Sequence, residues 1–383
     1  MASSSSAIDG TVLDGLGQPA PGVKVLLDDT VVTTDAAGRF SVAAAGQAYD
    51  LALSASADLA FVYQGMTTRT PIVRLDGTYL SPDESEATVL LEASGLDPAE
   101  WLGAAPSVLP GQPESSINFG TTSWRVRWAG HDPIRVGFYA STHELVDGQL
   151  GHSTGVLTAP PVLVHPNETR TFAVAPSSLM RSEESSVRAE VHLPPAYHVT
   201  QAVLWEGTAS DGCPIAPFDV MTQSSELSFF VPDAASRRGL TIEATSGDAT
   251  TDVYVDLPAA GTTVVEVPAA PSALSPDDGA SDVGGVTELR WTPVAGGTNF
   301  AVVYDGSGGS APTIRIAAAD GVARVPDLTP IGVALPPHAW VAWAAFSASP
   351  ARSVDDFARS GAATSPANPN VTTHGAPLAF LTR

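Results

Sequence analysis

Short apolar runs that alternate with polar residues fill this chain, and turn-forming residues separate them. Residues 8–42 show the pattern best, because β-branched positions such as Val12, Val23 and Val25 are followed by clusters of glycine, proline and aspartate. Nothing in this stretch has the period of an amphipathic helix. The pattern predicts four strands that form a small antiparallel sandwich.

The same alternation continues to the C-terminus. A single helical turn is expected over 97–102, where an acidic and proline-containing start resembles a helix N-terminus. The expected strands beyond residue 42 are 49–54, 60–64, 72–75, 88–92, 123–128, 134–140, 162–164, 170–174, 187–193, 199–205, 227–231, 240–245, 251–257, 262–267, 300–304, 341–345 and 377–381.

A chain of 383 residues is too long for one sandwich and suits three or four domains. We expect an all-β fold of tandem β-sandwiches that are immunoglobulin-like, transthyretin-like or fibronectin III-like. Residues 268–271, with a proline at each end, form the clearest linker. The expected domains are a sandwich at 1–84, a loop-rich β domain at 85–184, a sandwich at 185–268 and a last sandwich at 269–383.

Glycine, proline, aspartate and apolar residues recur in a fixed order near the N-terminus, at Gly10, Val12, Asp14, Gly17, Pro19, Gly22, Val23, Val25, Thr34, Asp35, Gly38 and Phe40. With these residues the segment resembles the carboxypeptidase regulatory-like (transthyretin-like) module over roughly residues 7–80. This resemblance implies a transthyretin-like fold and a non-catalytic role, and it names no ligand.

The C-terminal segment is similar to a fibronectin type III-like domain over about 110 residues. Trp291 would be the core tryptophan of an early strand. Phe300, Val302 and Tyr304 share one face of the next strand, and Val341, Trp343 and Ala345 share one face of a later strand. A long insertion at 349–374 departs from the simple fibronectin pattern.

The charge of the chain limits its partners. Eighteen lysine and arginine residues stand against 41 aspartate and glutamate residues, which gives a net charge of −23. Such a chain repels phosphate backbones, so nucleic acid is excluded as a partner. The only lysine is Lys24, and alanine, glycine, proline and aspartate are abundant. This composition favours a GC-rich bacterial genome, with adaptation to high salt as the alternative.

The location is expected to be extracellular, at the outer-membrane surface or in the periplasm. Cys213 is the only cysteine, so no intramolecular disulfide forms, and we interpret it as an incidental loop thiol. No apolar window is long enough to span a bilayer, and no signal peptide precedes the serine run at 3–6. Such a run is typical of a bacterial lipoprotein whose leader and lipid-bearing cysteine have been removed.

One short motif suggests catalysis. The segment 151–155 reads Gly-His-Ser-Thr-Gly and matches the G-x-S-x-G nucleophile elbow, with Ser153 as the nucleophile. That elbow requires a buried strand before the serine and a helix after it. Pro160 and Pro161 exclude such a helix, and no α/β alternation occurs in the chain. A serine hydrolase is therefore the least favoured hypothesis.

Metal and cofactor sites leave little trace in the sequence. The eight histidines show no H-E-x-x-H or H-x-H spacing. Adjacent carboxylates occur at 28–29, 277–278 and 355–356, and calcium binds such oxygens in sandwich loops, but solvated turns explain them better. We expect no cofactor, with structural calcium as the alternative.

Tryptophans are the candidate contact residues. Trp124 and Trp128 lie four apart on a predicted strand and share a face, with Arg125 and Arg127 on the other face. Core packing is the favoured interpretation of this face, and stacking on a sugar ring or a protein partner is the alternative. Trp101, in the loop-rich segment, is a further candidate for such a contact.

The sequence therefore predicts a non-enzymatic structural or binding protein of the bacterial cell surface or periplasm, acting in adhesion or protein interaction. Its partner would be a protein or a glycan at the cell surface, bound by loops at the ends of the sandwiches. The alternatives are a carbohydrate-binding protein and a self-assembling component of a filament or secretion machine, in which edge strands pair to form oligomers.

Overall fold

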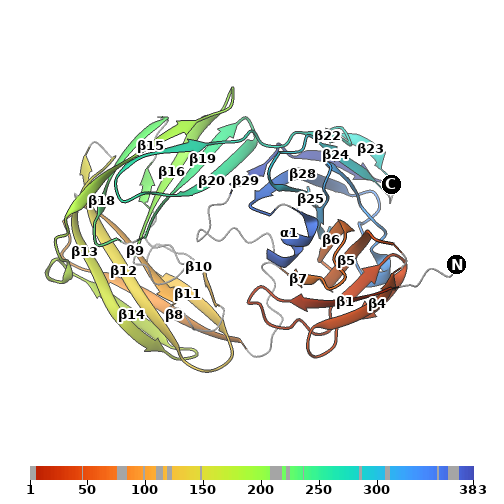
Figure 1. The fold of residues 1–383 in the computed structure, drawn as a ribbon, viewed down its shortest axis with the longest axis horizontal. Helices are drawn as coiled ribbons and strands as arrows, with labels where there is room; N and C mark the ends of the chain where they lie inside the picture. The colour runs from red at the N-terminus through yellow and green to blue at the C-terminus, as the bar shows by residue number, and fades with distance from the viewer. Residues whose placement is uncertain are drawn as a thin grey trace.

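A computed structural model describes residues 6–44, 46–75, 84–97, 100–108, 115–118, 123–146, 149–207, 218–220, 225–235, 237–283, 287–306, 311–351, 353–360 and 371–383. Within these residues nearly all regular structure is β-strand. The exceptions are the α-helix α1 (Val354–Ser360) and the 3-10 turns η1 (Pro176–Ser178) and η2 (Thr329–Ile331). The predicted fold class, all-β with tandem β-sandwiches, is confirmed (Figure 1).

The first sandwich packs a sheet of order β4-β1-β7 against strands β3-β2-β5-β6. Asp14 and Asp35 shape its turns, because each accepts hydrogen bonds from the backbone N–H groups two and four positions later. Its strands are β1 (Ser6–Leu13), β2 (Lys24–Leu27), β3 (Thr30–Thr33), β4 (Arg39–Ala44), β5 (Tyr49–Ser56), β6 (Leu59–Met66) and β7 (Ile72–Arg74).

The second sandwich packs a sheet of order β10-β11-β8-β14 against β13-β12-β9. The helical turn expected over 97–102 is wrong, because residues from Glu100 onward extend along β12 and form a strand with it. The strands are β8 (Glu84–Ala93), β9 (Glu100–Val108), β10 (Ser115–Asn118), β11 (Ser123–Ala129), β12 (Ile134–Val146), β13 (Gln149–Val164) and β14 (Thr169–Val174).

The third sandwich packs a sheet of order β18-β15-β21 against β17-β16-β19-β20. Alternation along β15 buries Val187, Ala189 and Val191 and exposes the residues between them, as the period of a half-buried strand requires. The strands are β15 (Glu184–His192), β16 (His198–Gly207), β17 (Phe218–Val220), β18 (Glu226–Pro232), β19 (Arg237–Ser246), β20 (Ala249–Asp256) and β21 (Gly261–Glu266).

The fourth sandwich packs a sheet of order β22-β24-β27 against β29-β28-β25-β26. Trp291 and Trp343 meet in its core with ring centroids 6.5 Å apart. The insertion at 349–374 supplies α1 and β29. The strands are β22 (Ala273–Ser275), β23 (Ala280–Val283), β24 (Glu288–Trp291), β25 (Thr298–Asp305), β26 (Thr313–Ala317), β27 (Val322–Arg324), β28 (Trp340–Ser349), β29 (Val371–His374) and β30 (Leu378–Thr382).

One sheet runs through three of the four sandwiches. Strand β26 of the fourth sandwich pairs in parallel with β6 of the first, and β29 pairs with β28 on one side and with β20 of the third on the other. The continuous order is β17-β16-β19-β20-β29-β28-β25-β26-β6-β5-β2-β3. The sandwiches therefore lie next to one another in the order first, fourth, third and second, which differs from their order in the sequence (Figure 1).

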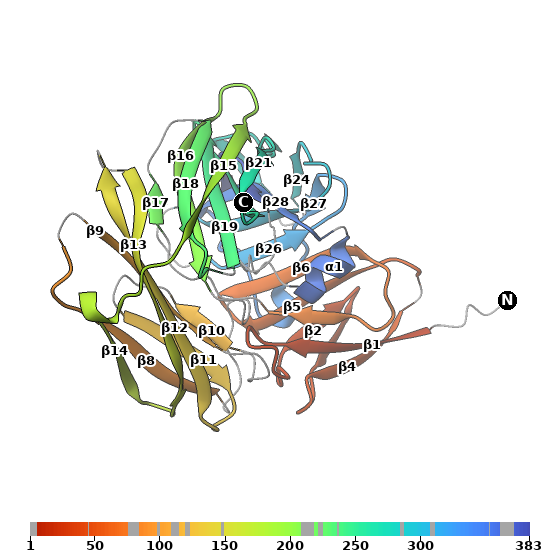
Figure 2. The ribbon, with the colours of Figure 1, turned by 60° about the vertical axis from the view of Figure 1, so that its left-hand side comes forward.

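The hydrophobic cores also cross between sandwiches. Phe300 and Phe357, from the C-terminal part of the chain, belong to the core of the first sandwich. Tyr139 and Val156 of the second sandwich complete the core of the third, where β13 lies against β18 (Figure 2). Buried apolar contact is the main stabilising term in folding, so these shared cores fix the sandwiches relative to one another.

Candidate functional site

The central strand of the second sandwich, β12, is buried on both faces. Its even-numbered residues from Ile134 to Ala140 point into the core of the second sandwich. The odd-numbered Tyr139, Ser141 and His143 share the opposite face, which lies against the third sandwich. A strand buried on both faces and carrying three polar side chains requires polar partners on the other side of the interface.

Glu206 supplies those partners from β16. It lies two residues after Leu204 on the inward face of the strand, and its side chain is fully buried. Its Oε2 accepts hydrogen bonds from the hydroxyls of Tyr139 at 3.1 Å and Ser141 at 2.9 Å. Its Oε1 lies 3.3 Å from Nε2 of His143, which is also fully buried. We call these four residues the interface cluster.

The surroundings of the interface cluster keep its tyrosine protonated. Burial first, and the charge of Glu206 second, raise the pKa of the Tyr139 hydroxyl well above its usual value, while Arg238 acts in the opposite direction. Tyr139 therefore remains a hydrogen-bond donor to Glu206 at physiological pH. All four side chains are closed to solvent, so the cluster holds two sandwiches together and offers no surface to a substrate.

Ser153 lies in the extended strand β13, opposite His143 in the β-sheet register. The strand continues through Pro160 and Pro161, so the strand-turn-helix geometry of a nucleophile elbow is not formed. The Ser153 N–H donates to Glu184 at 3.0 Å, and its buried Oγ has no hydrogen-bond partner among the described residues. The motif therefore lacks the hydrogen bond between nucleophile and base that activates a serine.

Trp124 and Trp128 belong to the core of the second sandwich, with exposed fractions of 2% and 0%. The Trp124 ring meets Phe138 edge-on, with the ring centroids 6.1 Å apart, and Trp128 Nε1 donates to the carbonyl of Asp132 at 2.9 Å. The alternative interpretation of these two rings as a glycan or partner contact is therefore wrong, because stacking needs an open ring face.

Two other tryptophans complete this comparison. Trp101 lies in β9 beside His143 in register, and its side chain lies outside the described part of the structure. Trp340, at the start of β28, is the one tryptophan whose described side chain is exposed, at 46%. The sequence patterns did not single out Trp340, although its place on the face of β28 opposite Val341 and Trp343 is a signal for its exposure.

A carboxylate pair lies on the shared sheet where the third sandwich meets β29. Asp252 of β20 stands opposite Glu243 of β19 and, on its other side, opposite Thr372 of β29. Burial first, and the charge of Glu243 second, raise the pKa of Asp252 from 3.8 to about 6, while His374 acts in the opposite direction. At neutral pH the Asp252 carboxylate is therefore ionised although burial and the charge of Glu243 oppose its ionisation, and this lowers the stability of the folded state.

This raised pKa predicts a pH dependence of stability. Between about pH 6 and pH 4 the folded protein binds a proton at Asp252 that the unfolded chain releases, so this contribution to stability grows as the pH falls through that window. We expect Asp252→Asn to raise the free energy of unfolding at pH 7 by about 1–2 kcal/mol, after allowance for partial exposure.

Urea denaturation at several pH values between 4 and 7 measures this effect. The difference between Asp252→Asn and the wild type is expected to shrink toward pH 4. Asp248→Asn, in the exposed turn between β19 and β20, is the matched control and is expected to leave the profile unchanged. If the difference in free energy of unfolding between Asp252→Asn and the wild type stays constant across this pH range, the raised pKa of Asp252 is contradicted.

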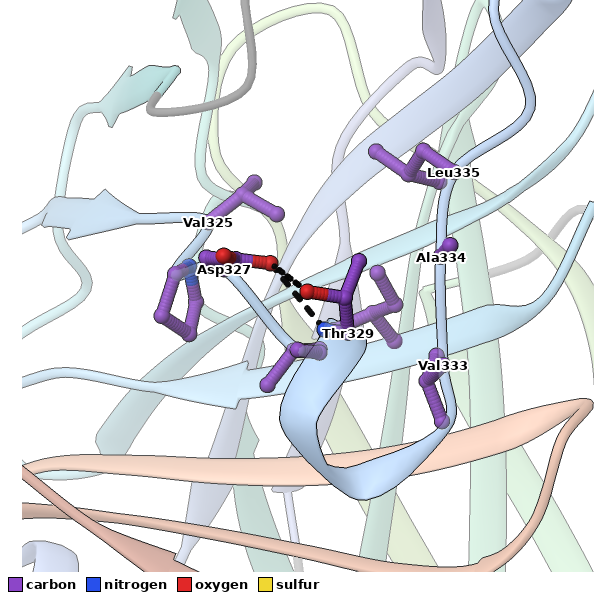
Figure 3. Close-up of a pocket in the computed structure, with 9 residues that line it drawn as sticks. Val325, Asp327, Thr329, Val333, Ala334 and Leu335 are labelled. Carbon is purple, nitrogen blue, oxygen red and sulfur yellow. Dashed lines mark hydrogen bonds between the residues drawn. The ribbon is translucent and has the colours of Figure 1, made fainter. Parts of the chain in front are cut away.

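A small apolar pocket opens beside the η2 turn of the fourth sandwich (Figure 3). Its volume is about 150 Å³. Asp327 lies at its edge, where its Oδ1 accepts hydrogen bonds from the Thr329 hydroxyl at 2.7 Å and the Thr329 N–H at 3.0 Å. These bonds lower the pKa of Asp327, so the pocket carries a negative charge at neutral pH.

The remaining sequence candidates fall in several places. Asp278 and Asp355 accept backbone hydrogen bonds from Ala379 and Thr67. Among the described residues no group of three histidine, cysteine, aspartate or glutamate side chains is placed to hold a metal ion. Cys213 lies outside the described residues. No helix in the described part of the chain is long and apolar enough to cross a membrane.

Comparison with known proteins gives only distant likenesses. No family model and no curated protein matches the sequence. A DUF3823 family protein from Parabacteroides merdae is 11% identical, with 52% of this chain and 100% of that chain covered and a TM-score of 0.20. The FN1–FN3 domains of chicken CNTN1 are 7% identical, with 95% and 99% covered and a TM-score of 0.19.

A bacterial surface protein is among these structures. BcpA, the major pilin subunit of Bacillus cereus, is 9% identical to this chain, with 68% of this chain and 99% of that chain covered and a TM-score of 0.13. At such scores the likeness carries no argument about family or activity. The described contacts of this chain therefore have to support any function proposed for it.

Proposed function

We propose that this protein is a non-enzymatic structural and binding protein of the bacterial cell surface or periplasm, acting in adhesion or protein interaction. The observation that carries this proposal is the sheet shared by the first, fourth and third sandwiches. Strand pairing across domain boundaries, together with the interface cluster, resists movement between sandwiches. Such a scaffold presents its loops in fixed positions, which reduces the entropy lost when a partner binds.

The first sandwich, in residues 1–84, is proposed to be a carboxypeptidase regulatory-like module. Its turn aspartates hold the hydrogen bonds described above, and the ring of Phe40 lies so close over Gly10 that a Cβ there would be 2.2 Å from a ring carbon. The last sandwich, in residues 269–383, is proposed to be fibronectin type III-like, with Trp291 in its core. Residues 85–184 and 185–268 are proposed to form the two domains that lie between these modules in the sequence.

The location is tested in the bacterium that encodes the protein. We expect an epitope placed after Arg383 to be removed by protease from intact cells, or to be found in the periplasmic fraction. Retention in the cytosolic fraction would overturn the proposed location.

A fluorophosphonate probe tests the absence of hydrolase activity, and labelling that disappears in Ser153→Ala would overturn the non-enzymatic assignment.

The partner is proposed to be a protein, with a cell-surface glycan as the alternative. Trp340 is the observation that favours the glycan, because an exposed indole ring can stack on a sugar. Binding on a glycan array that is lost in Trp340→Ala would support this alternative. A blank array would leave protein interaction as the function of the scaffold.

A further inference from the structure

The pocket beside η2 is a depression in the core of the fourth sandwich. Its floor is formed by Ile314, Leu328 and Val333, each at most 3% exposed. Val325 and Leu335 stand on opposite sides of the opening (Figure 3). Because the floor residues belong to the packed core, the pocket keeps its shape without a ligand. A volume of about 150 Å³ is enough to take up one aliphatic side chain.

The only charge in the pocket lining is that of Asp327. Its Oδ1 accepts two hydrogen bonds from Thr329, which orient the carboxylate, and the residue is exposed to solvent. Among the described residues no cation forms an ion pair with Asp327. The nearest arginine in sequence, Arg324, pairs with Glu288 at 3.5 Å. Lys24 directs its ammonium group to the other end of the turn, at Gly332.

An apolar depression with one oriented carboxylate at its edge is complementary to a ligand with an aliphatic body and a cationic tip. A lysine side chain has this form, since its methylene groups bury in apolar surroundings while the ammonium group stays at the edge. The net charge of −23 adds a long-range attraction for a basic partner. A second copy of this chain is disfavoured by the same charge.

We propose that this pocket binds a lysine side chain from a basic segment of a partner protein. The proposal rests on the proposed function, and it assigns the partner of the scaffold by chemical class. Lys24 is the only lysine of the chain, so the ligand comes from another protein. A single pocket of this size gives weak binding, and several such contacts or the overall charge would supply the rest of the affinity.

The test is a titration with n-butylammonium, observed by NMR of the methyl groups of isoleucine, leucine and valine. We expect saturable shifts at Leu328, Val333 and Leu335. The probe 1-butanol has the same size without the charge, and butyrate carries a negative charge on a similar aliphatic chain. The affinities are expected to fall in the order ammonium, alcohol, carboxylate. Asp327→Asn is expected to weaken butylammonium binding about fivefold and to leave 1-butanol unchanged.

Asp320→Asn is the matched control, because Asp320 is exposed in the same sandwich and lies outside the pocket lining. Circular dichroism verifies that both variants fold. Chemical shifts that do not saturate, or equal binding of all three probes, would overturn the proposal that the pocket binds a lysine side chain. Binding of butylammonium by a protein found only in the cytosol would overturn the proposed function and leave the pocket standing.

Discussion

Replacing Glu206 with alanine is expected to lower the free energy of unfolding by about 3–5 kcal/mol. The carboxylate is fully buried between the second and third sandwiches, and its Oε2 is the acceptor for the hydroxyls of Tyr139 and Ser141. Alanine removes that acceptor and leaves both donors in an apolar interface. Each unsatisfied buried donor costs about 1–3 kcal/mol, and the empty volume adds to this cost.

The chain contains a matched control for this substitution. Glu190 lies 3.2 Å from Nε2 of His192, a distance close to the 3.3 Å between Glu206 and His143, but both side chains are about half exposed. We expect Glu190→Ala to cost under about 1 kcal/mol, because solvent and salt screen an exposed pair. Urea denaturation at neutral pH, followed by tryptophan fluorescence, measures both variants. Equal costs for the two substitutions would contradict the role of the interface cluster.

Glu206→Gln separates charge from shape at the same position. Glutamine retains one acceptor oxygen for Tyr139 and Ser141, so its cost is expected to lie between those of the wild type and Glu206→Ala. Native-state hydrogen exchange is expected to show faster opening of β12 and β16 before other strands in either variant. Uniformly faster exchange would mean that the cluster stabilises the whole chain and not this interface in particular.

Local periodicity predicted the positions of most strands and the burial of individual side chains. Trp124, Val126 and Trp128 alternate with Arg125 and Arg127, and this period of two places the first set in the core. The same reasoning applied to β16 predicts that the Glu206 side chain points into the core, since it lies two residues after Leu204 and on the same face of the strand. Its partners on β12 could not be predicted, because contacts between sandwiches depend on packing that no local pattern specifies.

The shared sheet was also beyond the reach of the sequence patterns. Strands β6 and β26 are each ordinary apolar runs, and nothing in either run names the other as its parallel neighbour. Helix α1, in contrast, could have been predicted from residues within the insertion at 349–374. Ser353 caps its start, with Oγ accepting from the N–H of Asp356 at 3.1 Å, and Val354, Phe357 and Ala358 have helical spacing.

Phe357→Ala is expected to cost about 3–5 kcal/mol, although the residue lies far along the chain from the sandwich that it stabilises. Its ring is 5% exposed and packs against Phe300, with the ring centroids 4.9 Å apart, inside the core of the first sandwich. The same helix is tied to that sandwich through Asp355, whose carboxylate accepts hydrogen bonds from Thr67. Truncation of the ring therefore leaves a cavity at the junction of the first and fourth sandwiches.

The measurement is calorimetric unfolding of the full chain together with urea denaturation. Because α1 and the pairing of β6 with β26 join the two sandwiches, the wild type is expected to unfold them in one transition, and Phe357→Ala is expected to separate the first sandwich as an earlier one. Arg359→Ala, on the exposed side of α1, is the control and is expected to cost under about 1 kcal/mol. If Phe357→Ala also lowers the free energy of unfolding by under about 1 kcal/mol, the first sandwich is held to the fourth by strand pairing alone, and the helix contributes little to the scaffold.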